Sequence, residues 1–226
     1  MNSSEERLFD LDAEAPVEQV RFILAAQSWP SNADLIADAA RLGYLRGDVV
    51  VDMTYGRGVW WDRYRPPGLV AHDIATDGVD FRALPEADGS VDVVAFDPPY
   101  IPQVRVKDST VGDFLHRYGL SDGGLHEGDL RAVIDAGIHE AFRVLRPAGR
   151  MLMKAQNFVD GGYRPFAYES LRTAQQAGFR LDDEFVHLRP PGPLSSRCRQ
   201  QHHARRNYSH LFVLTKPKLP RAARNV

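Results

Sequence analysis

The feature that most constrains the fold of this chain is the alternation of short apolar runs with amphipathic stretches at helical spacing. The run Asp48–Asp52 is apolar between its two acids, as expected for a strand buried on both faces of a sheet. The pattern predicts helices over residues 33–42, 129–145 and 166–177, and strands over residues 48–52, 69–73, 90–96, 150–154, 185–188 and 211–214. Such alternation predicts a doubly wound α/β layer with mostly parallel strands. Because no helix separates the last two strands, we expect the last one to be antiparallel.

Length and composition indicate one globular domain. The chain has 226 residues, of which 43% are hydrophobic and 26% are charged, and no apolar run is long enough to cross a membrane. The acidic start without a secretory core predicts a cytoplasmic protein. The single cysteine, Cys198, excludes an internal disulfide. We expect a loose segment (1–17), one domain (18–216) that contains a mobile target-facing loop (101–128) and a basic loop (189–207), and a basic tail (217–226).

Charge is distributed unevenly along the chain. All 30 acidic residues lie within residues 1–184, whereas residues 185–226 carry nine Lys and Arg residues and no acid. A basic tail on an acidic body is a plausible electrostatic footprint for nucleic acid. A solvated and partly disordered C-terminus explains the same charge equally well.

The third predicted strand ends in the tetrapeptide Asp97-Pro98-Pro99-Tyr100. Each proline fixes its own φ and lacks an N–H, so the chain must turn stiffly where the strand stops. The Asp97 carboxylate and the Pro98 carbonyl could accept the two protons of an –NH₂ group on a flat ring, and Tyr100 could stack on that ring.

Asp-Pro-Pro-Tyr after an apolar strand resembles the signature of S-adenosylmethionine-dependent amino-methyltransferases, chiefly those that act on adenine or cytosine in DNA. The resemblance covers residues 27–216. It implies a Rossmann-like class I methyltransferase sheet of about seven strands with a reversed last strand. It also implies S-adenosylmethionine as the cofactor, and Asp97, Pro98, Pro99 and Tyr100 as the catalytic corner.

The resemblance also assigns the cofactor contacts. Asp52 with the glycine turn Gly56–Gly58 would hold the amino-acid end, Asp73 the ribose, and Asp80 with Phe81 the adenine. Trp61 stands where dinucleotide-binding turns carry a third glycine, which argues against a pyrophosphate ligand. Core packing, turn capping or ordinary loop roles are the alternatives for several of these residues. The complete set of expected cofactor-binding residues is Trp29, Ser31, Asp52, Met53, Thr54, Tyr55, Gly56, Gly58, Asp73, Ile74, Asp80, Phe81 and Asp97.

Nucleic acid is the expected partner, with DNA favoured over RNA and adenine over cytosine. The expected phosphate contacts are Arg105, Lys107, Arg197, Arg199, Arg205 and Arg206. A target base would have to be flipped out or single-stranded to reach the corner. No large target-recognition segment follows the tetrapeptide, which leaves room for a homodimer or a specificity partner. RNA methylation, methylation of a glutamine amide and a catalytically silent subunit are the alternatives. We expect no metal, because Cys198 offers only one thiolate.

Overall fold

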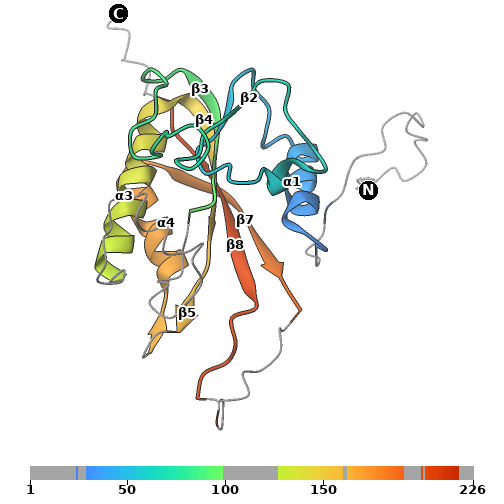
Figure 1. Ribbon diagram of the computed structural model, residues 1–226, viewed down its shortest axis with the longest axis vertical. Coiled ribbons are helices and arrows are strands. Elements are labelled where there is room, and N and C mark those ends of the chain that lie inside the picture. Colours follow the sequence, from blue (N-terminus) through green and yellow to red (C-terminus); the bar gives the residue numbers. More distant parts are fainter. Residues whose placement is uncertain are drawn as a thin grey trace, which may run out of the picture.

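The computed structural model describes residue 24 and residues 29–98, 127–159, 162–190, 200 and 202–218. The described part is built around one six-stranded sheet with the strand order β2-β1-β3-β4-β8-β7 (Figure 1). The strands are β1 (Val50–Asp52), β2 (Leu69–Ala71), β3 (Val91–Phe96), β4 (Leu145–Ala155), β7 (Arg180–Leu188) and β8 (Tyr208–Thr215). The predicted α/β class is confirmed, with six strands in this sheet where about seven were expected.

The sheet is parallel up to its last two strands. β1 pairs in parallel with both β2 and β3, and β3 pairs in parallel with β4. β8 is antiparallel to β4 and to β7, between which it lies. The predicted reversal of the last strand is therefore confirmed. It allows β7 and β8 to be joined without a crossover helix, as the sequence indicated.

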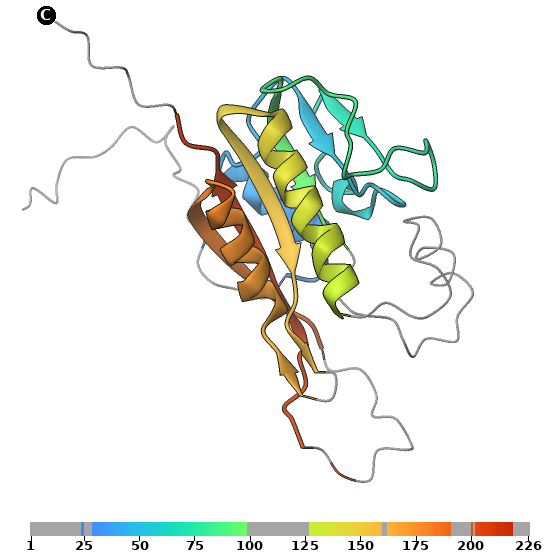
Figure 2. The ribbon, with the colours of Figure 1, turned by 90° about the vertical axis from the view of Figure 1, so that its left-hand side faces the viewer.

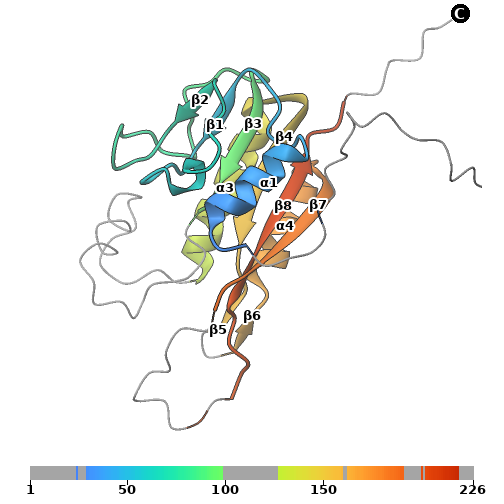
Figure 3. The same ribbon diagram turned by 90° about the vertical axis from the view of Figure 1, so that its right-hand side faces the viewer.

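Helices cover both faces of the sheet. Figure 2 shows α3 (Glu127–Val144) and α4 (Phe166–Gln176) side by side on one face, and Figure 3 shows α1 (Asn32–Arg41) on the other. The 3₁₀ turn η1 (Val59–Trp61) joins α1 on that face. Successive side chains of β3 point to opposite faces of the sheet and so enter two different cores. Val94 and Phe96 pack with α3 and α4, whereas Val93 and Ala95 pack with α1.

Two local details help to position the helices. Ser31 caps α1, since its Oγ accepts a hydrogen bond from the Asp34 N–H at 3.2 Å. In α3, a Cβ on Gly137 would lie 2.8 Å from the buried rings of Phe81 and Phe96. The absence of a side chain there lets α3 approach the sheet closely.

Two elements differ from the sequence-based expectation. The predicted helix 129–145 and strand 150–154 meet directly, because β4 begins at Leu145 and passes through Ala148, whose φ of +68° is left-handed. A short hairpin of β5 (Phe158–Val159) and β6 (Tyr163–Arg164) was not predicted. Most of the predicted segments 1–17, 101–128 and 217–226 lies outside the described residues, as does part of 189–207. No helix in the described part is long and apolar enough to cross a membrane.

Candidate functional site

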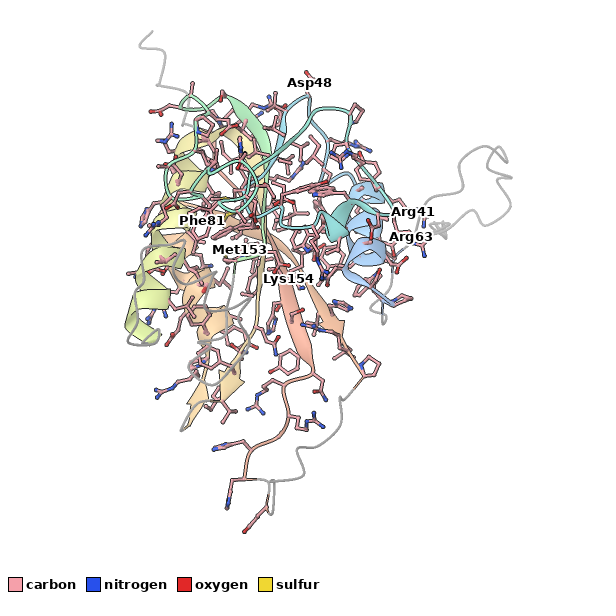
Figure 4. The ribbon with its side chains drawn as sticks, viewed as in Figure 1. Arg41, Asp48, Arg63, Phe81, Met153 and Lys154 are labelled. Atoms are coloured by element: carbon pink, nitrogen blue, oxygen red, sulfur yellow. The ribbon has the colours of Figure 1, made fainter. Side chains whose placement is uncertain are left out.

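The carboxyl ends of β1 and β3 form a pocket at one edge of the sheet. β1 ends at Asp52, and Asp97 follows β3 directly. Asp48, which precedes β1, lies toward the opposite edge, whereas Lys154 near the end of β4 lies close to the centre of the molecule (Figure 4). The pocket has a volume of about 170 Å³ and is lined by Asp52, Thr54, Tyr55, Gly56, Arg57, Val59, Trp60 and Asp97. The structure thus brings the predicted glycine turn and the predicted catalytic acid together.

Asp97 is held by groups from three different elements. The Trp60 indole N–H donates to Asp97 Oδ2 at 3.0 Å, and Lys154 Nζ of β4 lies 3.7 Å from the same oxygen. The Asp97 backbone N–H donates to Thr54 Oγ1 at 2.8 Å. The side chain lies deep in the protein but keeps 27% of its surface exposed. Burial raises the pKa of Asp97, and the Lys154 charge and the Trp60 hydrogen bond oppose that rise.

Asp52 is the second carboxyl group at the pocket and is only 4% exposed. The Trp61 indole N–H donates to its Oδ2 at 2.7 Å, and the Thr54 N–H donates to its Oδ1 at 2.9 Å. Burial raises the pKa of Asp52 to about 7, and the nearby charge of Asp97 adds to the rise. Asp52 therefore exists in both protonation states near neutral pH.

Asp73 connects the loop after β2 to the glycine turn. Its Oδ2 accepts from the Gly56 N–H at 3.0 Å, and its Oδ1 accepts from the Ala75 N–H at 2.8 Å. Gly56 and Gly58 have φ values of +53° and +71°, which favour glycine in a turn this tight. The predicted ribose-binding acid thus lies beside the predicted amino-acid-binding turn.

The residues expected at the adenine have other partners. Two nitrogens of the Arg82 guanidinium contact the Asp80 carboxylate, with Arg82 Nε 2.9 Å from Asp80 Oδ2. Phe81 is 0% exposed, and its ring packs edge-on against Phe96 at a centroid distance of 5.2 Å. Phe81 therefore presents no ring face to the pocket, because the core between the sheet and α3 encloses it.

Other expected cofactor residues also turn away from the pocket. The side chains of Met53 and Ile74 belong to the core on the α3 side of the sheet. The Trp29 indole N–H donates to Asp38 at 3.0 Å, and the Trp29 carbonyl oxygen lies 3.2 Å from His187 Nε2. Trp29 and Ser31 precede α1, and the side chain of each contacts it. A structural role of this kind was the alternative to cofactor binding that the sequence left open.

Sequence reasoning missed three side chains that contact the two carboxyl groups of the pocket. Trp61 was noted because it stands where dinucleotide-binding turns carry a third glycine, and Trp60 was given no role, yet each donates to a pocket carboxylate. Lys154 is 2% exposed and is the one charged residue in the run Met151–Ala155. That charge within an apolar strand was the available signal.

Some of the expected site residues lie outside the described part of the chain. Pro99, Tyr100, Arg105, Lys107, Arg197 and Arg199 lie outside the described residues, whereas Pro98 is described and buried. Arg205 is exposed, and the Arg206 guanidinium lies 4.7 Å from the centroid of the Tyr163 ring. Within the described ranges, no group of three or more His, Cys, Asp and Glu side chains could hold a metal ion.

Comparison with known proteins gives partial matches. No family model matches the chain. A stretch of 84 residues is 38% identical to the release factor glutamine methyltransferase of Mycobacterium tuberculosis, covering 37% of this chain and 25% of that protein. The enzyme of the same name from Bifidobacterium longum is 34% identical over 79 residues, which cover 34% of this chain and 26% of that protein. The chain thus spans about a quarter of the length of these curated relatives. A solved structure, the cytosine-N4-specific PvuII DNA methyltransferase, has a TM-score of 0.43 at 15% identity, covering 60% of this chain and 46% of that one.

Proposed function

We propose that this protein transfers a methyl group from S-adenosylmethionine to a planar –NH₂ group, with the exocyclic amine of a DNA base as the preferred acceptor and adenine ahead of cytosine. The observation that carries the proposal is the position of Asp97. Its carboxylate lies at the end of β3 and lines the same pocket as the glycine turn after β1. Ligands of open α/β sheets bind at such carboxyl ends.

The residues at the pocket fit a cationic cofactor without phosphate groups. Asp52 and Asp97 line the pocket, and Asp73 adjoins its glycine turn. The described lining thus holds two acids and one base, Arg57, a balance that suits the positive sulfonium and ammonium groups of S-adenosylmethionine better than a pyrophosphate. When bound, the cofactor would supply an electrophilic methyl group. We assign its amino-acid end to Thr54, Tyr55 and Gly56, and its ribose to Asp73.

Asp97 would act on the acceptor amine. The lone pair of such a nitrogen is delocalised into its ring, so the nitrogen is a weak nucleophile. Asp97 and the Pro98 carbonyl would accept its two protons along tetrahedral directions and so free the lone pair for attack. Both acceptors would bind the developing positive charge better than the flat ground state, as catalysis requires. Pro99 would fix the corner, and Tyr100 would stack on the base.

A glutamine amide is the second candidate acceptor. The matching stretches of the two curated relatives favour it, because both of those proteins are release factor glutamine methyltransferases. An amide nitrogen is also conjugated, so the same pair of acceptors could activate it. Asp97 argues for a base, because the glutamine-modifying class typically carries Asn at the first position of the signature.

Transfer of a labelled methyl group would test the proposal. The purified protein would be incubated with labelled cofactor and with duplex DNA, single-stranded DNA, total RNA or release factor, followed by nucleoside or peptide analysis. Labelled 6-methyladenine in DNA would support the preferred acceptor, and label in RNA or in a glutamine side chain would replace it. Asp97→Ala, which removes the acceptor oxygens, should lower kcat by roughly 100-fold or more while cofactor affinity, measured by calorimetry, stays close to wild type. Normal turnover by Asp97→Ala would refute the assigned role.

A further inference from the structure

Lys154 occupies a position where a charged side chain needs a specific reason. It lies near the end of β4 between the buried residues Met153 and Ala155, and only 2% of its surface is exposed. Removing an ammonium group from water costs several kcal/mol unless an opposite charge compensates it. The described ion-pair partner is Asp97, whose Oδ2 lies 3.7 Å from Lys154 Nζ.

The strand register explains why these two side chains meet. Phe96 of β3 is paired with Met153 of β4, so Asp97 and Lys154 are the next residues along two parallel neighbouring strands. Because side chains alternate along a strand, both point to the face opposite Phe96 and Met153, where α1 and η1 lie. Trp60 of η1 reaches Asp97 from that same face.

Trp60 and Lys154 approach the same oxygen of Asp97. Both of these contacts fall on Oδ2, and neither involves Oδ1. We propose that Lys154 is a positioning residue, which together with Trp60 fixes Oδ2 of Asp97 and keeps the carboxylate ionised so that Oδ1 can accept a proton of the substrate amine. The effect of Lys154 on catalysis rests on the proposed function. The ion pair between Lys154 and Asp97 can be tested without any substrate.

The charged groups around Asp97 show why a cation is needed there. Asp52 of β1 is a second acid at the same pocket, so ionisation of both carboxyl groups would place two negative charges close together. The compensating cations are Lys154 and, from the residue after β7, Arg189. The neutral Trp60 indole supplies a hydrogen bond but no charge. His187 of β7 lies near Lys154, and burial followed by the Lys154 charge lowers the pKa of His187.

The direct test follows the titration of Asp97 in the unliganded protein. Aspartate labelled with ¹³C at the carboxyl carbon would be observed by NMR, and the Asp97 signal would be assigned by its loss in Asp97→Asn. We expect Lys154→Met to raise the titration midpoint of Asp97 by at least about one pH unit, as removal of an adjacent opposite charge does. Lys154→Arg should remain within about half a unit of wild type, because it retains the charge. An unchanged midpoint in Lys154→Met would overturn the proposal.

A reciprocal measurement keeps the test decisive if Lys154→Met does not fold. The Nζ of Lys154 would be titrated in wild type and in Asp97→Asn. Loss of the partner carboxylate should lower the Lys154 midpoint by at least about one unit. An unchanged Lys154 midpoint would show that the two groups do not interact, and the proposal would fail.

The kinetic consequence is measured on whichever acceptor the labelled-methyl assay identifies. Lys154→Met should lower kcat at pH 7 by about tenfold or more, with recovery as the pH rises and with an unchanged KM for the cofactor. Lys154→Arg should restore the wild-type pH profile. A loss of kcat that is the same at every pH would indicate a merely structural role and would contradict the proposal. If wild type methylates no acceptor, the proposed function fails, while the NMR titrations still decide the role of Lys154.

Discussion

The buried carboxyl group of Asp52 should make the stability of the unliganded protein depend on pH. Asp52 has its pKa raised by burial from 3.8 to about 7. Between these two values the unfolded chain has lost the proton that the folded protein keeps, so the free energy of unfolding falls as the pH rises. Above pH 7 both states are ionised, and the loss is complete. Asp52→Asn cannot ionise and should remove this dependence.

The magnitude follows from the shift in pKa. A displacement of about 3 units at about 1.4 kcal/mol per unit corresponds to a loss of about 4 kcal/mol in unfolding free energy between pH 4 and pH 8. Little of it is screened by solvent, because Asp52 is 4% exposed. The substitution has a cost that does not depend on pH. Asparagine has one acceptor oxygen for the N–H groups of Trp61 and Thr54, so one of them loses its partner, at a cost of about 1–3 kcal/mol.

The stability curves of the two proteins should therefore cross. Urea unfolding, followed by tryptophan fluorescence at intervals from pH 4.5 to pH 8.5, should find Asp52→Asn less stable than wild type at the acid end and at least as stable at the alkaline end. Asp62→Asn is the matched control, since Asp62 is exposed directly after η1 and its substitution should change stability by less than about 0.5 kcal/mol at every pH. Parallel curves for wild type and Asp52→Asn would refute the assignment of a buried, partly protonated carboxyl group.

Two further substitutions test the fold around the site. Gly137→Ala should lower the free energy of unfolding in urea by about 1–3 kcal/mol, because the new Cβ would lie 2.8 Å from two fully buried phenylalanine rings, and this outweighs the better helix propensity of alanine. Gly162→Ala is the control, since a Cβ built on Gly162 meets no atom within 4 Å. Equal effects of the two substitutions would contradict the argument. His72 has one ring nitrogen 2.8 Å from Asp77 and the other 2.8 Å from Glu86, and although burial lowers its pKa these two partners raise it overall. The stabilisation of the folded protein by protonated His72 is present below about pH 6.5 and is lost as the pH rises through the raised pKa of His72, so His72→Gln should be most destabilising near pH 6. A loss of unfolding free energy in His72→Gln that grows toward pH 9 would refute this.

The sequence predicted the layers of the fold because hydrophobic periodicity reports burial directly. Ser31 caps the first helix, and a serine directly before a run with helical spacing is a typical sign of a helix start. The short hairpin β5–β6 escaped prediction because two-residue strands carry too few side chains to show a period. The available signal was the glycine pair Gly161-Gly162 between Phe158-Val159 and Tyr163, because paired glycines between aromatic residues are typical of hairpin turns.

The position of the candidate site was predictable, whereas its supporting contacts were not. Acids at strand ends converge by topology alone, which is why Asp52, Asp73 and Asp97 were identified from the sequence. The hydrogen-bond partners of these acids depend on how a loop folds back. Arg82 lies two residues from Asp80 and occupies its carboxylate, and Phe81 turns into the core. Neither outcome is encoded in the spacing of apolar residues, because both depend on which side of a turn faces the sheet.

The carboxylates of the pocket share one physical arrangement. Asp52 and Asp97 each lie beside the core, and each receives an indole N–H from the same 3₁₀ turn, through Trp61 and Trp60 respectively. Indole is suited to this position because its large apolar body belongs in the core while its single donor can satisfy a carboxylate at the border of that core. Asp97 alone has an additional described partner with a positive charge, Lys154. A buried lysine in an apolar strand departs from the rule that buried strand residues are apolar. Such departures are expected at functional sites, where other parts of the fold compensate for their cost in stability. The two acids therefore differ in the way that the proposed role of Asp97 requires: a cation lies beside Asp97, whereas burial raises the pKa of Asp52 to about 7.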